Sequence, residues 1–352
     1  MRWLSNSMFA VKRSLQVSAL GFNHCSSVCA LKSPRRTLLA WYSGSGECQN
    51  DQSVYVISID GLSSSKPLRI GNCTGNPVLI PTTGGKDAIL LWSKFEDNDR
   101  YANLASRWKT CSLWTQAIGI RNDKITLLYE PECIAGPERH LLGRCNPLIY
   151  NGSILLPLYD EVNRKCVIFQ DFKEIGQFGE NMIQPTIWRK GNKICSLSRN
   201  FGSQAKKSQY CESTSGGITW TNPTSSDLWN LNNSVQVVSW HGEDVVLWND
   251  TEGKQRKFMT LGVLEYKEGS FGFMEMTAKP IEVVGLQHGS YPSMCVDYDG
   301  NLNFSFTNAA RKIEYHVWNY KTFKQKRDNP PRRAGTGTGN CSKCQAKRTH
   351  LL

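Results

Sequence analysis

One stretch decides the fold of this chain: Met294-Cys295-Val296, then the turn Asp299-Gly300-Asn301, then Leu302-Asn303-Phe304-Ser305-Phe306. Both runs are rich in β-forming residues, and apolar and polar side chains alternate in the second. An Asp-Gly pair between two such runs is a strong hairpin signal, because the turn needs residues that tolerate positive φ. The stretch therefore predicts a β-hairpin.

The same pattern of run, turn and run recurs along the whole chain. The other turns are Ser33-Pro34-Arg35-Arg36, Gly84-Gly85, Asn151-Gly152, Lys190-Gly191-Asn192 and His241-Gly242-Glu243. Successive turns are about fifty residues apart, which is the spacing of four-stranded propeller blades. Six hairpins predict an all-β, six-bladed β-propeller over residues 20–320, after an N-terminal segment of residues 1–19. Helix is expected to be nearly absent, apart from turns near Glu132 or Ala309.

The end of the chain differs in composition from the predicted blades. From Lys321 onward, nine Lys and Arg residues accompany a single acid, Asp328, and part of the net charge of +12 arises here. The segment also contains Pro330-Pro331 and a Gly-Thr repeat, so residues 321–352 are expected to form a disordered basic tail. A solvated tail is the simpler interpretation, and polyanion binding is the alternative.

Composition limits the class of protein and leaves its compartment open. The chain has 352 residues, of which 39% are hydrophobic, and no apolar run approaches the roughly 18 residues of a membrane span. The first residues lack the apolar core and cleavage site of a signal peptide. A secretory route is favoured instead by thirteen cysteines and by Asn-X-Ser/Thr acceptors at Asn72, Asn151, Asn232, Asn249, Asn303 and Asn340.

No metal or other cofactor is expected. Only Cys341 and Cys344 have a spacing typical of zinc ligands, and they lack the second pair of cysteines or histidines that a structural zinc needs.

One octapeptide resembles the Asp-box, the Ser-X-Asp-X-Gly-X-Thr-Trp hairpin of sialidase-type propellers: Ser213-Thr214-Ser215-Gly216-Gly217-Ile218-Thr219-Trp220. Small residues allow a tight reversal, the Thr can bond the backbone and the Trp packs between strands. Ser215 stands where the motif has Asp, so a hydroxyl replaces the carboxylate that stabilises the turn. The resemblance implies a peripheral, stabilising element without a catalytic role.

More of the chain is similar to the sialidase-like BNR/Asp-box repeat family, over roughly residues 20–320. The similar segments, in chain order, are Phe22-Asn23-His24-Cys25-Ser26-Ser27, Ala40-Trp41-Tyr42-Ser43-Gly44-Ser45-Gly46-Glu47, Gly75-Asn76-Pro77-Val78-Leu79, Gly143-Arg144-Cys145-Asn146-Pro147, Ile183-Gln184-Pro185-Thr186, Asn232-Asn233-Ser234 and Ser290-Tyr291-Pro292. The resemblance implies a sialidase-like six-bladed propeller.

A propeller brings the starts of its innermost strands to one face, where ligands bind. The polar residues expected there to bind a substrate are His24, Asn76, Arg144, Tyr159, Gln184, Arg199, Asn233, Arg256 and Arg311. Arginine forks suit a carboxylate because they bond it bidentately, and Arg144 is expected to be the central partner. Glu161, Glu47 and Tyr291 are the catalytic candidates, since glycoside hydrolysis generally needs two carboxyls, or in sialidases a tyrosine nucleophile.

The chain departs from well-characterised sialidases at two places. His24 stands where those enzymes carry an arginine in a Phe-Arg-Ile-Pro motif. Their nucleophilic Tyr precedes a Ser, whereas Tyr291 follows Ser290. Several candidates also have a structural alternative: Arg256 and Arg311 as strand-surface charges, Glu161 as a solvated loop acid, Tyr291 as a core aromatic and His24 as a satisfied polar residue.

Two functions remain open on the sequence. The first is an exo-sialidase-like glycoside hydrolase that acts on a terminal acidic sugar of a glycan or glycoconjugate. The alternative is a non-catalytic propeller that binds glycans or proteins, and the missing first-blade arginine favours it. Nucleic-acid binding is not expected, because the blades do not interleave aromatic and basic residues as a stacking platform does. The oligomeric state is left open.

Overall fold

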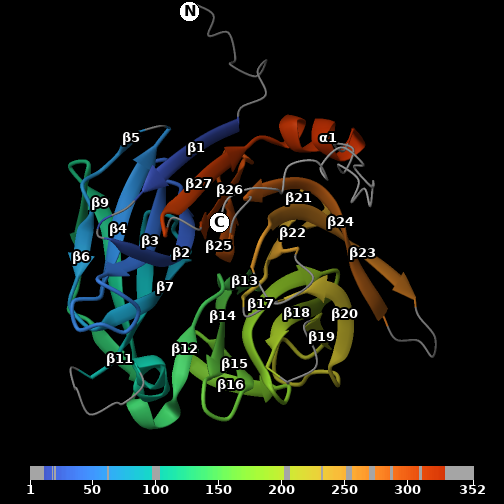
Figure 1. Ribbon diagram of the computed structural model, residues 1–352, viewed down its shortest axis with the longest axis horizontal. Helices are drawn as coiled ribbons and strands as arrows, with labels where there is room; N and C mark the ends of the chain where they lie inside the picture. Colours follow the sequence, from blue (N-terminus) through green and yellow to red (C-terminus); the bar gives the residue numbers. More distant parts are fainter. Residues whose placement is uncertain are drawn as a thin grey trace, which may run out of the picture.

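The computed structural model describes residues 12–17, 19, 21–61, 63–96, 104–201, 207–230, 233–250, 256–268, 274–285, 288–308 and 311–329. Six antiparallel sheets lie radially around a central axis (Figure 1). The predicted all-β, six-bladed propeller is therefore confirmed. In the described part of the chain, helix is confined to α1 and two short 3-10 segments.

The first three blades follow one another along the chain. Blade 1 contains β2 (Phe22–Leu31), β3 (Arg36–Gly44), β4 (Ser53–Asp60), β5 (Ser63–Ser64) and β6 (Leu68–Ile70). Blade 2 contains β7 (Thr74–Pro81), β8 (Asp87–Lys94), β9 (Ser112–Arg121), β10 (Lys124–Leu127) and β11 (Glu132–Ala135), with the 3-10 helix η1 (Leu104–Thr110) between β8 and β9. Blade 3 contains β12 (Leu141–Gly143), β13 (Leu148–Tyr150), β14 (Ser153–Asp160), β15 (Lys165–Gln170) and β16 (Lys173–Phe178), preceded by η2 (Pro137–Arg139).

The last three blades are four-stranded. Blade 4 contains β17 (Met182–Lys190), β18 (Lys193–Asn200), β19 (Lys207–Ser213) and β20 (Thr224–Trp229). Blade 5 contains β21 (Gln236–Trp240), β22 (Glu243–Asn249), β23 (Met259–Glu268) and β24 (Met274–Gly285). Blade 6 contains β25 (Ser290–Val296), β26 (Leu302–Thr307), β27 (Ile313–Trp318) and, as its outer strand, β1 (Lys12–Val17).

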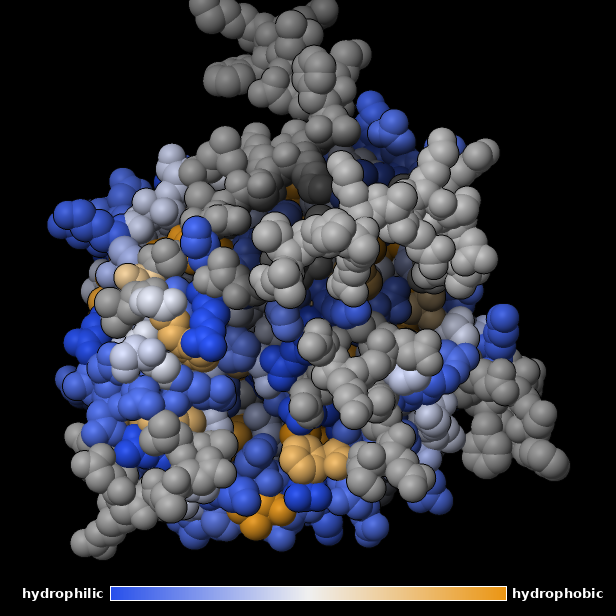
Figure 2. Space-filling model, viewed as in Figure 1, coloured by the Kyte–Doolittle hydropathy of each residue, from blue (hydrophilic) through white to orange (hydrophobic). Residues whose placement is uncertain are grey.

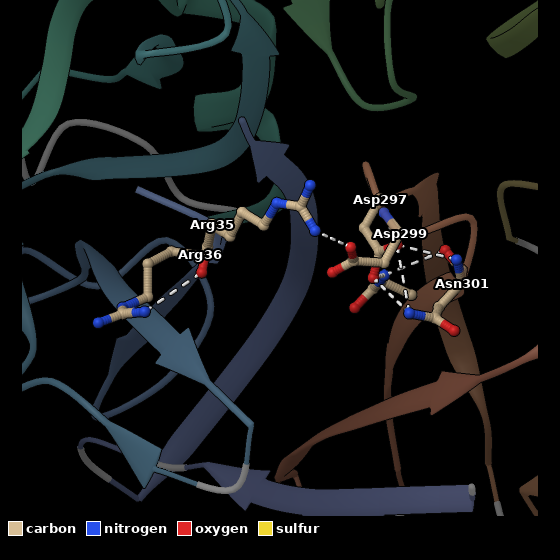
Figure 3. A network of polar contacts seen from close by, with 6 residues as sticks. Arg35, Arg36, Asp297, Asp299 and Asn301 are labelled. Carbon is tan, nitrogen blue, oxygen red and sulfur yellow. Dashed lines mark hydrogen bonds and ion pairs between the residues drawn. The ribbon is translucent and has the colours of Figure 1, made fainter. Parts of the chain in front are cut away.

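The six predicted turns join the innermost strand of each blade to the next strand, all at one end of the propeller, which we call the hairpin end. The opposite end, where β2, β7, β17 and β25 begin, is the entry end. Figure 3 shows the hairpin end between blades 1 and 6, where Arg35 forms an ion pair with Asp299. There the Asp297 carboxylate accepts hydrogen bonds from the backbone N–H groups of Asp299 and Asn301, at 2.9 and 2.8 Å, and so fixes the turn.

Both ends of the chain differ from the predicted domain boundaries. Residues 12–17, expected to precede the propeller, form β1, which pairs with β27 and completes blade 6. Residues 320–328, expected to lie mostly in the flexible tail, form helix α1 (Tyr320–Asp328). Asn319 caps this helix, and Phe323 is fully buried against Trp240. Tail residues 330–352, with Cys341 and Cys344, lie outside the described residues.

The motif resembling an Asp-box forms the turn between β19 and β20, as expected. The Ser215 hydroxyl accepts a hydrogen bond from the Thr219 backbone N–H at 2.8 Å, so it replaces the carboxylate of the motif. Trp220 stacks on Phe178 of blade 3 at 4.2 Å between ring centroids. The motif therefore fastens blade 4 to blade 3 at the periphery.

The surface facing the viewer is predominantly hydrophilic, with hydrophobic residues in small separate patches (Figure 2). No helix in the described part of the chain is long and apolar enough to span a membrane. The eleven cysteines there are free thiols. Two of the predicted glycosylation acceptors, Asn249 and Asn303, are buried.

Candidate functional site at the entry end

The innermost strands of four blades share one irregularity at the entry end. In β2, β7, β17 and β25 the pairing register shifts within the first few residues. At each shift one residue has a positive φ: Cys25 at 49°, Asn76 at 46°, Gln184 at 55° and Tyr291 at 52°. Such bulges re-aim side chains, and a non-glycine residue in this region costs about 1–3 kcal/mol. Strain repeated around one end of the channel indicates a functional face.

Tyr291 lies at the centre of a group of predicted site residues. The Arg256 guanidinium lies 4.9 Å from the centroid of its ring and donates a hydrogen bond to its hydroxyl at 3.4 Å. The His24 ring packs edge-on against Tyr291 at 4.6 Å between centroids. The backbone N–H of Tyr291 donates to Asn233 Oδ1 at 2.6 Å. The fold thus brings together residues from blades 1, 5 and 6, as predicted.

Positive charge surrounds this group. Arg311 lies 4.7 Å from the centroid of the Phe22 ring, next to His24 on β2. Burial, together with the nearby charges of Arg256, Arg144 and Arg311, holds the pKa of His24 well below its usual range. His24 is therefore a neutral imidazole at pH 7, and arginines supply the positive charge.

Arg144 lies beside Tyr291 at the entry end, where the sequence led us to expect it, but its guanidinium is bonded to the protein itself. Its side chain is 1% exposed and lies 5.2 Å from the centroid of the Tyr291 ring. Its guanidinium donates to the carbonyls of Ser26 at 2.9 Å and Pro292 at 3.1 Å, and its Nε donates to Ser234 Oγ at 3.2 Å. Because two backbone carbonyls, from blades 1 and 6, and the Ser234 hydroxyl occupy its guanidinium, Arg144 cross-links three blades beneath Tyr291.

Asn146, which the sequence analysis did not single out, extends this buried support. Its Nδ2 donates to the carbonyls of Val28 at 3.1 Å and Met294 at 2.7 Å, and its Oδ1 accepts from Ser293 Oγ at 2.8 Å. Its backbone N–H donates to Gln236 Oε1 at 3.2 Å. Arg144 and Asn146 thus cross-link strands that line the channel, which keeps the entry end rigid.

Glu47 lies on the blade 1 side of the site. Its exposed carboxylate accepts a hydrogen bond from Trp108 Nε1 at 3.0 Å. Tyr42 and Cys25 lie beside it, and burial raises the pKa of Cys25 to about 12, with Arg144 and Glu47 adding smaller opposing effects. That thiol stays protonated, so a carboxylate is the better candidate for acid–base chemistry on this side.

Glu161 and Arg199 form a second group towards blades 3 and 4. Burial raises the pKa of Glu161, and the charges of Arg199, Lys109 and Arg164 oppose part of that rise. Tyr159 lies between this group and the first: burial raises its pKa, the nearby Glu161 raises it further, and Tyr291 contributes a smaller effect. Gln184, which is 6% exposed, adjoins Tyr159. Asn76 is buried on the blade 2 side.

Among the buried amides at this end, two that are bonded through one side-chain atom have no partner for the other atom within the described part of the chain. Asn233 Nδ2 and Asn249 Oδ1 have no partner there, although the other amide atom of each side chain is bonded. Buried polar atoms are nearly always paired with protein or water. Their position indicates that water or a ligand completes the site. Among the described residues, no cluster of three His, Cys, Asp or Glu side chains could hold a metal.

Comparison with known proteins agrees with this architecture. The family model of the BNR repeat-like domain matches residues 35–304. The chain belongs to this family. Its solved structural neighbours include Trypanosoma rangeli sialidase in complex with the inhibitor DANA, at 14% identity and a TM-score of 0.61 over 88% of this chain and 56% of that one. A Hadza microbial sialidase matches at 11% identity and a TM-score of 0.64, over 85% of this chain and 66% of that one. No curated protein matches the sequence.

These likenesses establish the sialidase-like propeller fold for the BNR repeat-like chain, which spans little more than half the length of the trypanosomal enzyme.

Two residues at the entry end, Asn146 and Asn249, were not predicted as site residues from the sequence. The Asn-Pro pair at residues 146–147 parallels Asn76-Pro77 and Gln184-Pro185, and this repetition is the signal that could have found Asn146. Asn249 had been interpreted only as a glycosylation acceptor, and its 1% exposure places it inside the fold.

Proposed function

We propose that this protein is a sialidase-like glycoside hydrolase that acts on a terminal acidic sugar bound at the entry end. The observation that carries the proposal is the convergence of Arg256 and His24 on Tyr291, a tyrosine held at positive φ. The structural neighbours are sialidases, and one was solved with sialic acid. This chain's fold and the chemistry of its site suit the same class of ligand.

The carboxylate of the sugar would bind on the side of Arg256 and Arg311. A guanidinium pairs with a carboxylate through two parallel hydrogen bonds, and such charge-assisted bonds are about twice as strong as neutral ones. His24, being neutral, contributes a hydrogen-bonding nitrogen instead of a third charge. The unpartnered amide atoms of Asn233 and Asn249 would serve polar groups of the sugar or ordered water.

Tyr291 would act as the nucleophile. Its hydroxyl would pass its proton to solvent water as its oxygen attacks the anomeric carbon and forms a glycosyl–tyrosine bond, while the glycosidic bond breaks and the leaving oxygen receives a proton from a carboxylic acid. Water would then attack the same carbon and break the glycosyl–tyrosine bond. The carboxylate would take a proton from that water, and the released tyrosine oxygen would regain its proton from solvent. Glu47 is the first candidate for this acid and base. Glu161 is the second, since its raised pKa keeps it protonated to a higher pH.

A non-catalytic glycan-binding propeller is the second candidate function. The observation that favours it is His24, which stands where the family resemblance predicts an arginine. With one cation fewer, the site has less charge with which to stabilise a transition state. Binding of an acidic sugar would still be supported by Arg256 and Arg311.

Turnover of fluorogenic glycosides, measured beside direct sugar binding, separates these functions. We expect the parent protein to cleave a sialoside in preference to a neutral glycoside. Tyr291→Phe should abolish cleavage while keeping binding, and Tyr298→Phe at the hairpin end is the matched control that should cleave normally. Binding without cleavage in the parent would establish the binding function instead. A parent that neither binds nor cleaves acidic glycosides would contradict both.

A further inference from the structure

Trp108 ties the short helix η1 of blade 2 to the carboxylate of Glu47 on blade 1. Its Nε1–H donates to Glu47 Oε1 at 3.0 Å, and its side chain is 8% exposed. Glu47 itself is exposed, and this is the one hydrogen bond of its carboxylate within the described residues. A buried donor thus fixes one oxygen of an acid that would otherwise move freely in solvent.

The indole ring of Trp108 has little room to move. A Cβ atom added to Gly75, at the start of β7, would lie only 2.5 Å from Cη2 of this ring. The ring therefore rests on the strand backbone itself, at a place where the residue has no side chain. Phe95 packs edge-on against the ring, with 5.8 Å between centroids. These contacts hold the donor nitrogen in place.

Arg107, the preceding residue, fastens η1 to the loop that carries Glu47. Its Nη1 donates to the Cys48 carbonyl at 2.9 Å and to Asn50 Oδ1 at 2.6 Å. The Cys48 backbone N–H donates to Gln52 Oε1 at 2.7 Å, and Gln52 Nε2 donates to the first carbonyl of β7 at 2.8 Å. Because both partners of the tryptophan–carboxylate bond are braced by blade 2, the bond joins two fixed segments.

A row of packed rings connects Trp108 with Tyr291. Between ring centroids, Trp108 lies 6.0 Å from Tyr42, and Tyr42 lies 5.7 Å from His24. His24 lies 4.6 Å from Tyr291. Tyr42 is completely buried, and side chains in a close-packed interior keep their separations. The carboxylate held by Trp108 is therefore fixed relative to the proposed nucleophile.

The chemistry of an indole determines which oxygen of Glu47 is available. An indole N–H can only donate, so Glu47 Oε1 must accept from Trp108. In a protonated carboxyl group the carbonyl oxygen is the better acceptor. The acidic proton would then be on Oε2, the oxygen that Trp108 leaves free.

We infer that Trp108 positions Glu47 as the acid and base of the proposed hydrolysis. This inference rests on the proposed function and assigns a step for which Glu161 is the other candidate. Glu47 Oε2 gives its proton to the leaving glycosidic oxygen as the bond from that oxygen to the anomeric carbon breaks. The resulting carboxylate later takes a proton from the attacking water and so regains its first state. Trp108 acts through Glu47 and is a positioning residue.

Two substrates with different leaving groups test this role: a nitrophenyl sialoside and sialyl-lactose. Nitrophenolate can leave without a proton, whereas the lactose oxygen must be protonated, so only sialyl-lactose needs an aligned acid. We expect Trp108→Phe to lower kcat/KM for sialyl-lactose about tenfold more than for the nitrophenyl sialoside, because phenylalanine keeps an aromatic ring but lacks the N–H. Glu47→Gln should show the same selective loss, larger by about a further tenfold.

Trp240→Phe is the matched control. Trp240 is also buried, and its Nε1–H donates to the Gly300 carbonyl at 2.8 Å at the hairpin end. Its ratio of the two kcat/KM values should equal that of the parent. Because each ratio is measured within one variant, partial unfolding of a preparation does not change it. Combining Trp108→Phe with Glu47→Gln should give the ratio of Glu47→Gln alone, since the tryptophan then has no acid to orient.

An unchanged ratio in Trp108→Phe would reduce Trp108 to a structural role and overturn the inference. A selective loss in Glu161→Gln instead of Glu47→Gln would also overturn it and leave the proposed function standing. The same holds for a parent that cleaves only the nitrophenyl sialoside, because such a protein has no working acid. A parent that cleaves neither substrate would contradict the proposed function itself, and the inference with it.

Discussion

At the scale of the residue, Arg144 shows that a charged residue in an apolar stretch of sequence can either bind a ligand or be buried as a structural support. It was chosen as a ligand-binding residue because it is a charge in an apolar strand entry. The same setting buries it completely, and its fork bonds backbone carbonyls of blades 1 and 6. Sequence alone does not separate these outcomes, because the partners are 118 and 148 residues away.

Arg144→Lys should therefore lower stability before it affects binding. Lysine keeps the charge but loses the fork, and hydrogen bonds to charged groups contribute about 1.5–3 kcal/mol each. We expect the free energy of unfolding, measured by chemical denaturation, to fall by about 2–3 kcal/mol. Arg256→Lys, the matched change at the arginine proposed to bind the sugar carboxylate, should leave stability nearly unchanged and weaken binding. Unchanged stability together with weaker sugar binding in Arg144→Lys would show that Arg144 binds the ligand.

His24 makes stability depend on pH in a defined direction. Its folded-state pKa lies below the unfolded value of about 6.5, so in the window between the two values only the unfolded chain binds the proton. Stability should therefore fall as pH drops below about 6.5, by up to about 1.4 kcal/mol per pH unit from this group. Denaturation curves from pH 8 to pH 5 should show a smaller fall for His24→Gln. Parallel curves for parent and variant would mean that His24 titrates normally.

At the scale of the element, the hairpins were predictable because each depends on adjacent residues: a turn that tolerates positive φ between two apolar runs. The bulges at the entry end were not predicted, although three of them precede proline, in Asn76-Pro77, Gln184-Pro185 and Tyr291-Pro292. Their left-handed residues are stabilised by packing between blades, which no local pattern shows. The residues around Tyr291 were predictable in part, as entry positions of known blades.

The Asp-box turn offers a stabilising substitution. In Ser215→Asp, a carboxylate would accept the Thr219 backbone N–H in place of the hydroxyl, and charge-assisted bonds are the stronger kind. We expect thermal and chemical denaturation to show a gain of about 1 kcal/mol. Thr214→Asp adds the same charge one residue earlier and should give no gain. An unchanged or lower stability of Ser215→Asp would show that the turn does not accommodate the carboxylate.

Helix α1 was missed because the basic composition of its segment dominated the interpretation. The local signal was present: Asn319 Oδ1 accepts hydrogen bonds from the backbone N–H and the hydroxyl of Thr322, both at 2.8 Å, as an N-cap does. The buried Phe323 then anchors the helix against blades 5 and 6.

Two truncations test where the folded unit ends. A chain ending at Asn329 retains α1 and should unfold at the same denaturant concentration as the full chain. A chain ending at Asn319 loses Phe323 from the core, and removing a buried phenylalanine side chain costs about 3–5 kcal/mol. Equal stability of the two truncated chains would show that α1 contributes nothing to the fold.

At the scale of the whole molecule, the repeat of about fifty residues was enough to predict six blades, but not how the ring closes. Closure depends on β1, whose residues 12–17 pair with residues 313–318 at the other end of the chain. A single strand without its own hairpin has no periodic signal. The face formed by the six blade entries, by contrast, follows from the architecture, and this face carries the proposed sugar site.

The central claim is that the entry end recognises the carboxylate of an acidic sugar. The most direct measurement is calorimetric titration of the protein with sialic acid and with its methyl ester, which differ in that charge. We predict that the acid binds at least tenfold more tightly than the ester, and that Arg256→Gln removes the difference. Equal binding of acid and ester, or an undiminished preference in Arg256→Gln, would contradict the account.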